Sequence, residues 1–249
     1  MPWLRIAHRG AAGTRPELTR AAFERALEIG VDMIEIDVQL TRDQQLVVLH
    51  DRELGRTLQG EGAVRDHTFD ELRALDAGAW FALEYAGARV PSLAEVLDLT
   101  DGKAALNVEV KSPAPDWTCT AAAVVDLLTD RGRLESTVIS SFETGALRAV
   151  RERSPQARLG VLWHTADLDP MWLLAEALNA CSVHPHWSLI DAALVEQAHA
   201  RALEVIAWTV NDLEAIALLV GLGVDGIISD FPERLHELEQ RSAASGSVS

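Results

Sequence analysis

Positive charge is scarce in this sequence. Its 249 residues include 22 Lys and Arg against 38 Asp and Glu, a formal net charge of −16. Nucleic-acid binding requires a basic surface that displaces the counterions of the phosphates, and anionic lipid headgroups repel an acidic surface. The composition therefore argues against a nucleic-acid partner and against stable membrane insertion. Any phosphate that the protein binds must meet a local cluster of cations.

Cysteines and long apolar runs are also few. The two cysteines, Cys119 and Cys181, lie 62 positions apart, without the spacing of a zinc site or a disulfide framework. The longest apolar candidate, Ala215 to Val224, has ten residues, fewer than the roughly 18 that cross a bilayer. No charged and apolar leader precedes the first strand-like run. We therefore expect a soluble protein of the reducing cytoplasm.

Short apolar runs alternate with amphipathic segments along the chain. Apolar residues make up 48% of it, enough for a full core. Eight strand and helix repeats predict an α/β fold, a TIM (β/α)8 barrel spanning residues 1–241. An open doubly wound sheet would need a glycine-rich turn after the first run, which the sequence lacks. The runs are Leu4–His8, Met33–Val38, Ala105–Val110, Thr137–Ser140, Arg158–Leu162, Ser182–His184, Val205–Val210 and Gly226–Ser229.

Helix boundaries carry their own signals. A Ser or Thr followed three residues later by Glu predicts a capping box, and a glycine just after an apolar period predicts a helix end. The predicted capping boxes are Thr68 to Glu71, Ser92 to Glu95 and Ser140 to Glu143, and the predicted terminal glycines are Gly30, Gly102 and Gly223.

One segment interrupts the repeats. Leu46–Leu49 predicts an additional strand, and residues 51–91 carry turn signals and one short helix, Phe69–Leu75. We interpret 51–91 as a small inserted subdomain after the second barrel strand. Its aromatic residues form either its own core or a lid over the substrate; they are Trp80, Phe81 and Tyr85. The polar tail 242–249 is expected to be disordered.

Carboxylates occupy strand positions that would otherwise be apolar. Residues two apart on a strand share a face, so Glu35 and Asp37 point the same way, as do Asn107, Glu109 and Lys111. The C-terminal ends of barrel strands carry the chemistry of this fold. Three converging carboxylates favour a hard cation, Mg²⁺ or Ca²⁺. The alternative is a layer of salt bridges, in which Lys111 and arginines balance the acids.

Two histidines end strands that open into the same mouth. His8 is followed by Arg9, and His50 ends the additional strand. A histidine pair can divide acid and base roles, while Arg9 and Lys111 can bind phosphate oxygens. Trp208 either forms a wall of the pocket or packs in the core. His184 either contacts the substrate or structures its loop.

Six short motifs follow one another in order. They are His8-Arg-Gly10, Glu35-Ile-Asp37, His50-Asp51, Asn107-Val-Glu-Val-Lys111, Ala207-Trp-Thr-Val-Asn211 and Gly226-Ile-Ile-Ser-Asp230. Together they resemble the glycerophosphodiester phosphodiesterase family, in its bacterial cytosolic type, from residue 5 to about 235. The sequence departs from the usual family pattern at Leu18, where an Asn is common, and at Leu58, where a Thr is common.

The resemblance implies hydrolysis of glycerophosphodiesters to glycerol 3-phosphate and an alcohol, with one divalent cation, Mg²⁺ or Ca²⁺. It implies attack by the substrate's own hydroxyl and a cyclic phosphate that water then opens. We assign His50 as the first base and His8 as the acid, although the reverse order stays open. Carried over by position, Glu35, Asp37 and Glu109 are the metal ligands, His8 and His50 the catalytic pair, and Arg9, Lys111 and Trp208 the substrate contacts.

Three other functions compete with this interpretation. A lysophospholipase D or sphingomyelinase D-like phosphodiesterase would act on membrane lipids. A non-catalytic barrel could bind glycerol phosphates, although loss of a carboxylate or histidine would then be expected. A sugar-phosphate isomerase would need a glycine-rich phosphate loop after the last strands, where the sequence reads Ser229-Asp-Phe-Pro232.

Overall fold

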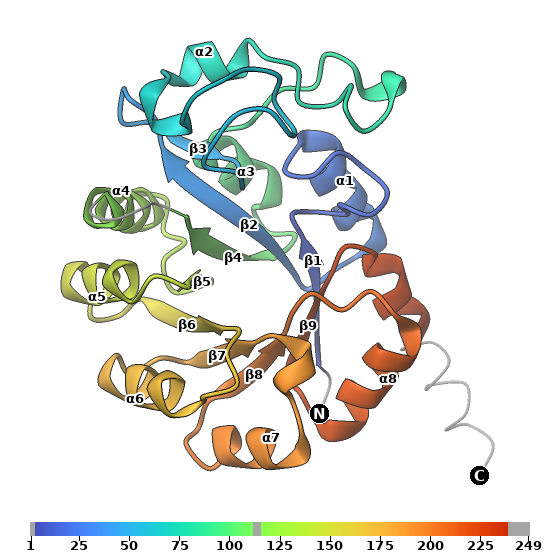
Figure 1. Cartoon of the computed structure of the whole chain (residues 1–249), viewed down its shortest axis with the longest axis vertical. Helices are drawn as coiled ribbons and strands as arrows, with labels where there is room; N and C mark the ends of the chain where they lie inside the picture. Colours follow the sequence, from blue (N-terminus) through green and yellow to red (C-terminus); the bar gives the residue numbers. More distant parts are fainter. Residues whose placement is uncertain (1–2, 112–115, 239–249) are drawn as a thin grey trace.

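Eight parallel strands form a closed barrel at the centre of the molecule (Figure 1). The computed structural model describes residues 3–111 and 116–238. Each barrel strand pairs with the next along the chain, and β9 pairs with β1 to close the ring, which confirms the TIM barrel. The strands are β1 (Leu4–His8), β2 (Met33–Leu40), β4 (Ala105–Val110), β5 (Thr137–Ser141), β6 (Arg158–Trp163), β7 (Ser182–Pro185), β8 (Glu204–Ala207) and β9 (Gly226–Ser229).

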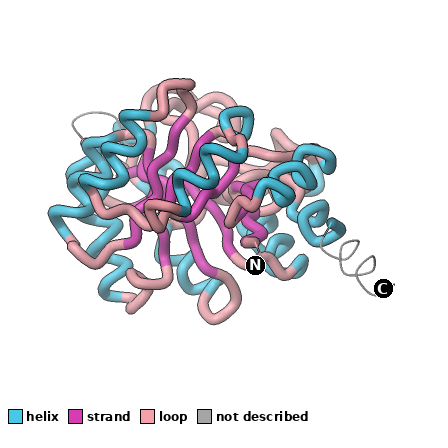
Figure 2. Tube along the Cα trace, turned by 90° about the horizontal axis from the view of Figure 1, so that it is seen from below, coloured by secondary structure: helices cyan, strands magenta, loops and turns pink. Residues whose placement is uncertain are grey.

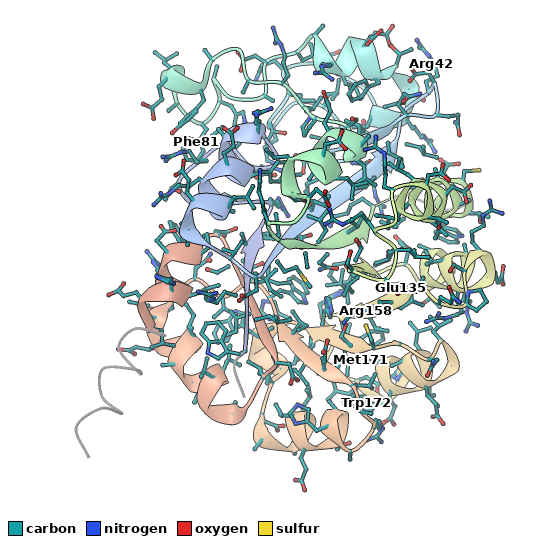
Figure 3. All side chains as sticks on the ribbon, turned by 180° about the vertical axis from the view of Figure 1, so that it is seen from behind. Arg42, Phe81, Glu135, Arg158, Met171 and Trp172 are labelled. Atoms are coloured by element: carbon teal, nitrogen blue, oxygen red, sulfur yellow. The ribbon has the colours of Figure 1, made fainter. Side chains whose placement is uncertain are left out.

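Helices cover the outside of the barrel (Figure 2). Outward-facing strand residues such as Ile34 and Val108 pack against the apolar stripes of the helices, and Met171 on α6, labelled in Figure 3, is fully buried in this layer. This layer is the main hydrophobic core. The helices are α1 (Arg20–Ile29), α3 (Leu93–Thr100), α4 (Trp117–Asp130), α5 (Thr144–Arg153), α6 (Asp169–Ala177), α7 (Ala192–His199) and α8 (Leu213–Leu222).

A second, smaller apolar cluster fills the inside of the barrel. It contains inward-facing residues from several strands: Ile6, Met33, Val138, Ile206 and Ile228. Because side chains two apart share a face, the next inward positions on these strands toward their C-terminal ends include His8 and Glu35. The barrel therefore has an apolar floor beneath a polar mouth.

The inserted segment has its own elements and its own small core. Strand β3 (Leu46–Val48) runs antiparallel to the end of β2, and the segment continues through η1 (Val64–Asp66), α2 (Phe69–Arg73) and η2 (Leu83–Tyr85). Leu58 is 1% exposed in this core, so the family's usual Thr is replaced here by a residue that adds apolar burial. The other buried members are Val47, Leu49, Val64, Leu72, Ala77 and Val90.

The three aromatic residues of the insertion pack on one another rather than in that core. Trp80 meets Phe81 edge to face at 5.7 Å between ring centroids, and Phe81 meets Tyr85 at 5.9 Å. The guanidinium of Arg15, from the loop between β1 and α1, lies 5.8 Å from the Tyr85 ring. Phe81 lies at the outer edge of the molecule in Figure 3. The trio therefore joins the insertion to the first loop.

Two of the three predicted capping boxes are confirmed. Thr68 and Glu71 cap α2, and Ser92 and Glu95 cap α3, with both reciprocal hydrogen bonds formed. The box predicted at Ser140 is wrong, because Ser140 lies buried within β5. There the helix begins after Glu143, whose backbone N–H donates to the hydroxyl of Ser141.

The predicted helix ends are also confirmed. Gly30 and Gly223 adopt left-handed conformations at the C-termini of α1 and α8, where their backbone N–H groups cap the last carbonyls. Gly102 is left-handed in the turn after α3.

Strand boundaries differ from expectation by more than one residue in two strands, β2 and β8. β2 continues to Leu40 because its last residues pair with β3 rather than with the barrel. β8 ends at Ala207 instead of Val210, since the backbone N–H of Val210 donates to Ile228 from outside the strand. The tail 242–249 lies outside the described residues. Within the described ranges, no helix has the length and apolarity to cross a bilayer.

The cap of α3 gives a test of this fold. Ser92→Ala removes the hydroxyl that accepts from the Glu95 N–H, so we expect the free energy of unfolding to fall by about 1 kcal/mol in urea titration. Ser154, after the C-terminus of α5, is the matched control, because its hydroxyl caps no helix N-terminus. An equal loss in Ser154→Ala would contradict the capping account.

Candidate active site

Polar side chains gather at the C-terminal mouth of the barrel. The strand register places His8 beside Glu35, Glu35 beside Asn107, and Asp37 beside Glu109. His8, Glu35, Asn107 and Glu109 line a cavity of about 170 Å³. Its lining also includes Arg9, His50, Lys111, Phe142 and Trp208. A larger groove of about 760 Å³ lies outside the barrel against α1 and α3. It contains no metal-ligating cluster among the described residues.

Three carboxylates converge in this mouth. Glu35, Asp37 and Glu109 are all buried, at 4%, 1% and 7% exposure. Each offers an oxygen, and these oxygens lie within 4.8 Å of one another. Such a cluster of hard donors is costly to bury without positive charge.

Two cations lie against the carboxylates. Lys111 Nζ is 2.8 Å from Glu109 Oε1 and 3.4 Å from Asp37 Oδ1. Arg9 Nε is 3.3 Å from Asp37 Oδ2, without the alignment of a hydrogen bond, and the Arg9 backbone N–H donates to Glu35 at 3.2 Å. These contacts partly match the salt-bridge layer. Two cations nevertheless face three carboxylates, so the layer is not balanced.

The pKa values of the three carboxylates reflect this excess of acidic over basic side chains. Burial, followed by the charges of Asp37 and Glu109, raises the pKa of Glu35 well above its usual value. Burial and the Asp37 charge raise the pKa of Glu109 to about 7. Burial also acts to raise the pKa of Asp37, but Arg9 and Lys111 outweigh it and hold this pKa low. With all three carboxylates ionised, the mouth would carry more negative charge than Arg9 and Lys111 neutralise.

The carboxylates fit a divalent cation. Asp37 Oδ2 is buried and has no hydrogen-bond partner among the described residues. The Arg9 guanidinium lies 3.3 Å from this oxygen without forming a hydrogen bond to it, and a buried carboxylate oxygen without a hydrogen bond is costly. Carboxylate donors without cysteine or histidine match Mg²⁺ or Ca²⁺ better than zinc. The observed cluster is therefore compatible with a divalent metal site.

His8 is oriented by the end of β9. Its Nδ1 lies 2.6 Å from Asp230 Oδ1, and since a carboxylate only accepts, Nδ1 carries the hydrogen. Asp230 is held in turn by Asn211, whose amide donates to Oδ2 at 2.6 Å. The other ring nitrogen, Nε2, faces the mouth 3.8 Å from Glu35. This nitrogen is the one available for proton transfer.

His50 has the same kind of support. Its Nδ1 lies 2.7 Å from Asp51 Oδ1, which leaves Nε2 for the cavity. Burial lowers the pKa of His50, against the opposing charge of Asp37. The amide of Gln39 donates to the backbone carbonyls of Leu49 and Asp51, at 2.8 and 2.9 Å. The backbone around His50 is thereby fixed from β2.

The loop after β1 has an unusual backbone. Arg9 (φ 52°) and Gly10 (φ 80°) are both left-handed, and a Cβ at Gly10 would lie 2.7 Å from the backbone of Ala22. Leu18 is left-handed too (φ 56°), and its N–H donates to the Arg9 carbonyl. The family's usual Asn adopts this conformation more readily than Leu. Leu18 is 2% exposed, so apolar burial offsets the backbone cost.

The opposite wall of the cavity is aromatic. The Trp208 ring packs edge to face with Phe142 and His186, each at 5.3 Å, and its Nε1 donates to the carbonyl of His184. The His184 side chain is itself buried, with Nε2 2.8 Å from the Ser182 hydroxyl. Burial lowers the pKa of His184 to about 3, so this ring is a neutral structural group.

Several groups around the site were given no role by the sequence analysis. Asp230, Asn211 and Asp51 stood in the quoted motifs without a function, while Gln39 and Glu17 were not singled out. An acidic residue directly after a histidine of the mouth, as in His50-Asp51, could have indicated from the sequence that this carboxylate supports the ring. The others are brought in by pairing between distant segments.

The fold and the site together define a TIM-barrel phosphodiesterase. The profile of the glycerophosphoryl diester phosphodiesterase family matches residues 8–234, and the chain belongs to this family.

Individual relatives agree with this membership. The chain is 40% identical over 242 residues to a glycerophosphodiester phosphodiesterase of Caldanaerobacter subterraneus, covering 97% of this chain and 99% of the relative. One from Bacillus altitudinis is 34% identical, with 94% and 97% covered. An Oleispira antarctica phosphodiesterase, solved with the product sn-glycerol-3-phosphate, superposes with a TM-score of 0.88 at 31% identity, with 95% and 96% covered.

The charge imbalance can be measured without substrate. Because the pKa of Glu109 is raised, its ionised form destabilises the folded state as the pH rises above about 4.5, with the full cost above about 7. In EDTA at pH 8, we expect Glu109→Gln to be more stable than the unchanged protein by about 1–3 kcal/mol. At pH 4.5 the two should unfold alike. A variant that is less stable at pH 8 would contradict the imbalance.

Proposed function

We propose that this protein hydrolyses glycerophosphodiesters to glycerol 3-phosphate and an alcohol, using one Mg²⁺ or Ca²⁺ ion. The observation that carries this proposal is one small cavity lined by His8, His50, Arg9, Lys111, Glu35 and Glu109, with the third buried carboxylate, Asp37, within 4.8 Å of the other two. The product bound by the Oleispira relative is the one proposed here. Such a reaction belongs to glycerol and lipid metabolism. The two free cysteines, Cys119 and Cys181, suit the reducing cytoplasm as the location of the protein.

Glu35, Asp37 and Glu109 would hold the cation. When bound, it supplies a Lewis acid that withdraws charge from the phosphate oxygens and neutralises the acidic mouth. Arg9 and Lys111 bind the remaining phosphate oxygens, since a guanidinium offers a fork of donors and an ammonium a point charge. Trp208 packs against the apolar face of the glycerol carbons.

His50 acts first, as a base. Its pKa is lowered by burial, so its Nε2 is unprotonated near pH 7. It takes the proton from the glycerol hydroxyl next to the phosphate, whose oxygen forms a bond to phosphorus. His8 gives a proton from Nε2 to the departing alcohol oxygen as its bond to phosphorus breaks, while the contact of Nδ1 with the Asp230 carboxylate holds the ring in place.

Water then opens the cyclic phosphate by the reverse transfers. His8, now neutral, takes a proton from water, whose oxygen bonds to phosphorus. His50 returns its proton to the glycerol oxygen that leaves phosphorus. Both histidines end in their starting states, so the cycle needs no serine or cysteine nucleophile.

A lysophospholipase D-like activity ranks second, because the Oleispira relative was solved with sn-glycerol-3-phosphate as its product. The cavity of about 170 Å³ adjoins a second hollow of about 480 Å³ that shares His50 and Lys111 with it. The non-catalytic binding barrel ranks lower still, because both histidines and all three carboxylates are in place.

The direct test is release of glycerol 3-phosphate from a panel of glycerophosphodiesters. We expect turnover that EDTA abolishes and that Mg²⁺ or Ca²⁺ restores, because metal removal leaves the carboxylates unneutralised. The panel, with choline, ethanolamine, glycerol and inositol esters and one lysolipid, also reveals the preferred alcohol. Undiminished turnover in EDTA would contradict the metal-dependent reaction, and turnover of the lysolipid alone would favour the second activity.

The histidine roles predict a separate loss. His8→Ala and His50→Ala should each lower kcat by about 10²–10⁴-fold, because a proton transfer loses its carrier. Affinity for the metal, measured by calorimetry, should stay near that of the unchanged protein. His199 is the matched control, since it also pairs with a carboxylate, Asp225, but lies outside the site. Near-normal kcat in either site variant would remove that residue from the mechanism.

A further inference from the structure

One arginine of the insertion bridges two carboxylates from different parts of the chain. Arg56 Nη1 and Nη2 donate to Glu17, in the loop after β1, at 2.9 and 2.8 Å. Arg56 Nε and Nη2 donate to Asp51 at 2.5 and 3.0 Å. Arg56 thus makes four hydrogen bonds to two carboxylates, Glu17 and Asp51, which lie 39 and 5 positions away in the sequence.

Each of these carboxylates continues to a group of the active site. Glu17 Oε1 accepts from Arg9 Nη1 at 2.9 Å, and Asp51 Oδ1 lies 2.7 Å from His50 Nδ1. Arg9 and His50 both line the cavity, whereas Arg56 lies outside it and lines an adjoining hollow with His50 and Lys111. An unbroken chain of charged groups therefore connects the phosphate-binding arginine with the proposed base, and Arg56 is its centre.

We propose that Arg56 is a positioning residue that sets the orientation of both His50 and Arg9 for catalysis. This inference rests on the proposed function, in which His50 moves the first proton and Arg9 binds the phosphate. It also assigns the insertion a part in the reaction, because the insertion supplies the arginine that links the two loops.

Charge explains why the bridge matters. Glu17 and Asp51 accept from the same atom, Arg56 Nη2, so the two carboxylates lie near each other across it. Glu17 and Asp51 are 12% and 23% exposed at the side chain. Without Arg56 these two negative charges would repel, and each would compete for the remaining cation beside it. Asp51 would then no longer be fixed against the His50 ring.

The geometry requires a guanidinium. A planar fork can place two parallel donors on Glu17 and two on Asp51 at once, whereas an ammonium is a single point charge. Lysine at this position could meet one carboxylate well but not both in this arrangement. A purely structural surface pair, in contrast, would contribute only about 0–1 kcal/mol to stability and nothing to the rate.

The chain offers a matched control arginine. Arg42 Nη2 donates to both oxygens of Glu71 at 3.2 Å, and its side chain is 56% exposed, against 45% for Arg56. Arg42 lies at the outer edge of the molecule in Figure 3 and does not line the cavity. It shares the type of interaction with Arg56 without the connection to the site.

The test is chemical rescue of Arg56→Ala, in which added guanidinium can occupy the space left by the arginine side chain. Arg56→Ala should lower kcat by about 10- to 100-fold, because His50 and Arg9 lose their fixed geometry. Its melting temperature should remain close to that of the unchanged protein. Millimolar guanidinium should restore part of the rate in Arg56→Ala, and it should not accelerate the unchanged protein or Arg42→Ala. Unchanged kcat in Arg56→Ala, or a loss that guanidinium does not restore, would overturn the proposal.

A second measurement does not depend on turnover. In ¹⁵N-histidine NMR spectra at one fixed pH, the His50 signals, assigned by their loss in His50→Ala, should shift in Arg56→Ala and return with guanidinium. They should not shift in Arg42→Ala. If the unchanged protein turns over no glycerophosphodiester, the proposed reaction fails while these spectra still decide the positioning. His50 signals that stay in place in Arg56→Ala would overturn it.

Discussion

The main physical constraint on this structure is the excess of buried acidic side chains at the C-terminal mouth of the barrel. Three buried carboxylates meet there with only two cationic side chains, Arg9 and Lys111, beside them, and the raised pKa values of Glu35 and Glu109 reflect the cost. A site of this kind is stable only with protons or with added positive charge. A divalent cation would supply that positive charge, and the anionic phosphate of the substrate could then bind beside the carboxylates. On this account, the imbalance that destabilises the metal-free mouth is also what would give it affinity for a divalent cation.

A second ring of carboxylates supports the inner groups. Asp230 holds His8, Asp51 holds His50, and Glu17 holds Arg9, each through a contact of 2.6 to 2.9 Å. All three come from loops, at the end of β9, in the insertion and after β1. The barrel strands place the three carboxylates proposed to bind the metal, and the loops orient the groups proposed to move protons and bind phosphate. Part of the acidic composition of the chain is explained by this second ring.

The central features could be predicted from the sequence because they follow local rules. Alternation along a strand placed Glu35 with Asp37, and the end of β1 placed His8 at the mouth. The prediction that His50 ends the additional strand is wrong, because β3 ends at Val48 and His50 follows it by two residues. The capping box at Ser140 failed because the same Ser-x-x-Glu pattern can belong to a strand end, where the β5 ladder holds Ser140. The bridge from Glu17 to Arg56 could not be foreseen, since it depends on how two loops meet after folding. Asn211 and Asp230 escaped attention for the same reason, because β8 and β9 bring them together.

The central claim is that Glu35, Asp37 and Glu109 form one divalent cation site. Calorimetric titration of the metal-free protein with Mg²⁺ and with Ca²⁺, at pH 8 and without substrate, tests it most directly. The account predicts one ion per chain for the unchanged protein and no measurable binding in Asp37→Asn, whose circular dichroism should stay unchanged. Equal stoichiometry and affinity in Asp37→Asn, or no binding of either ion by the unchanged protein, would contradict it.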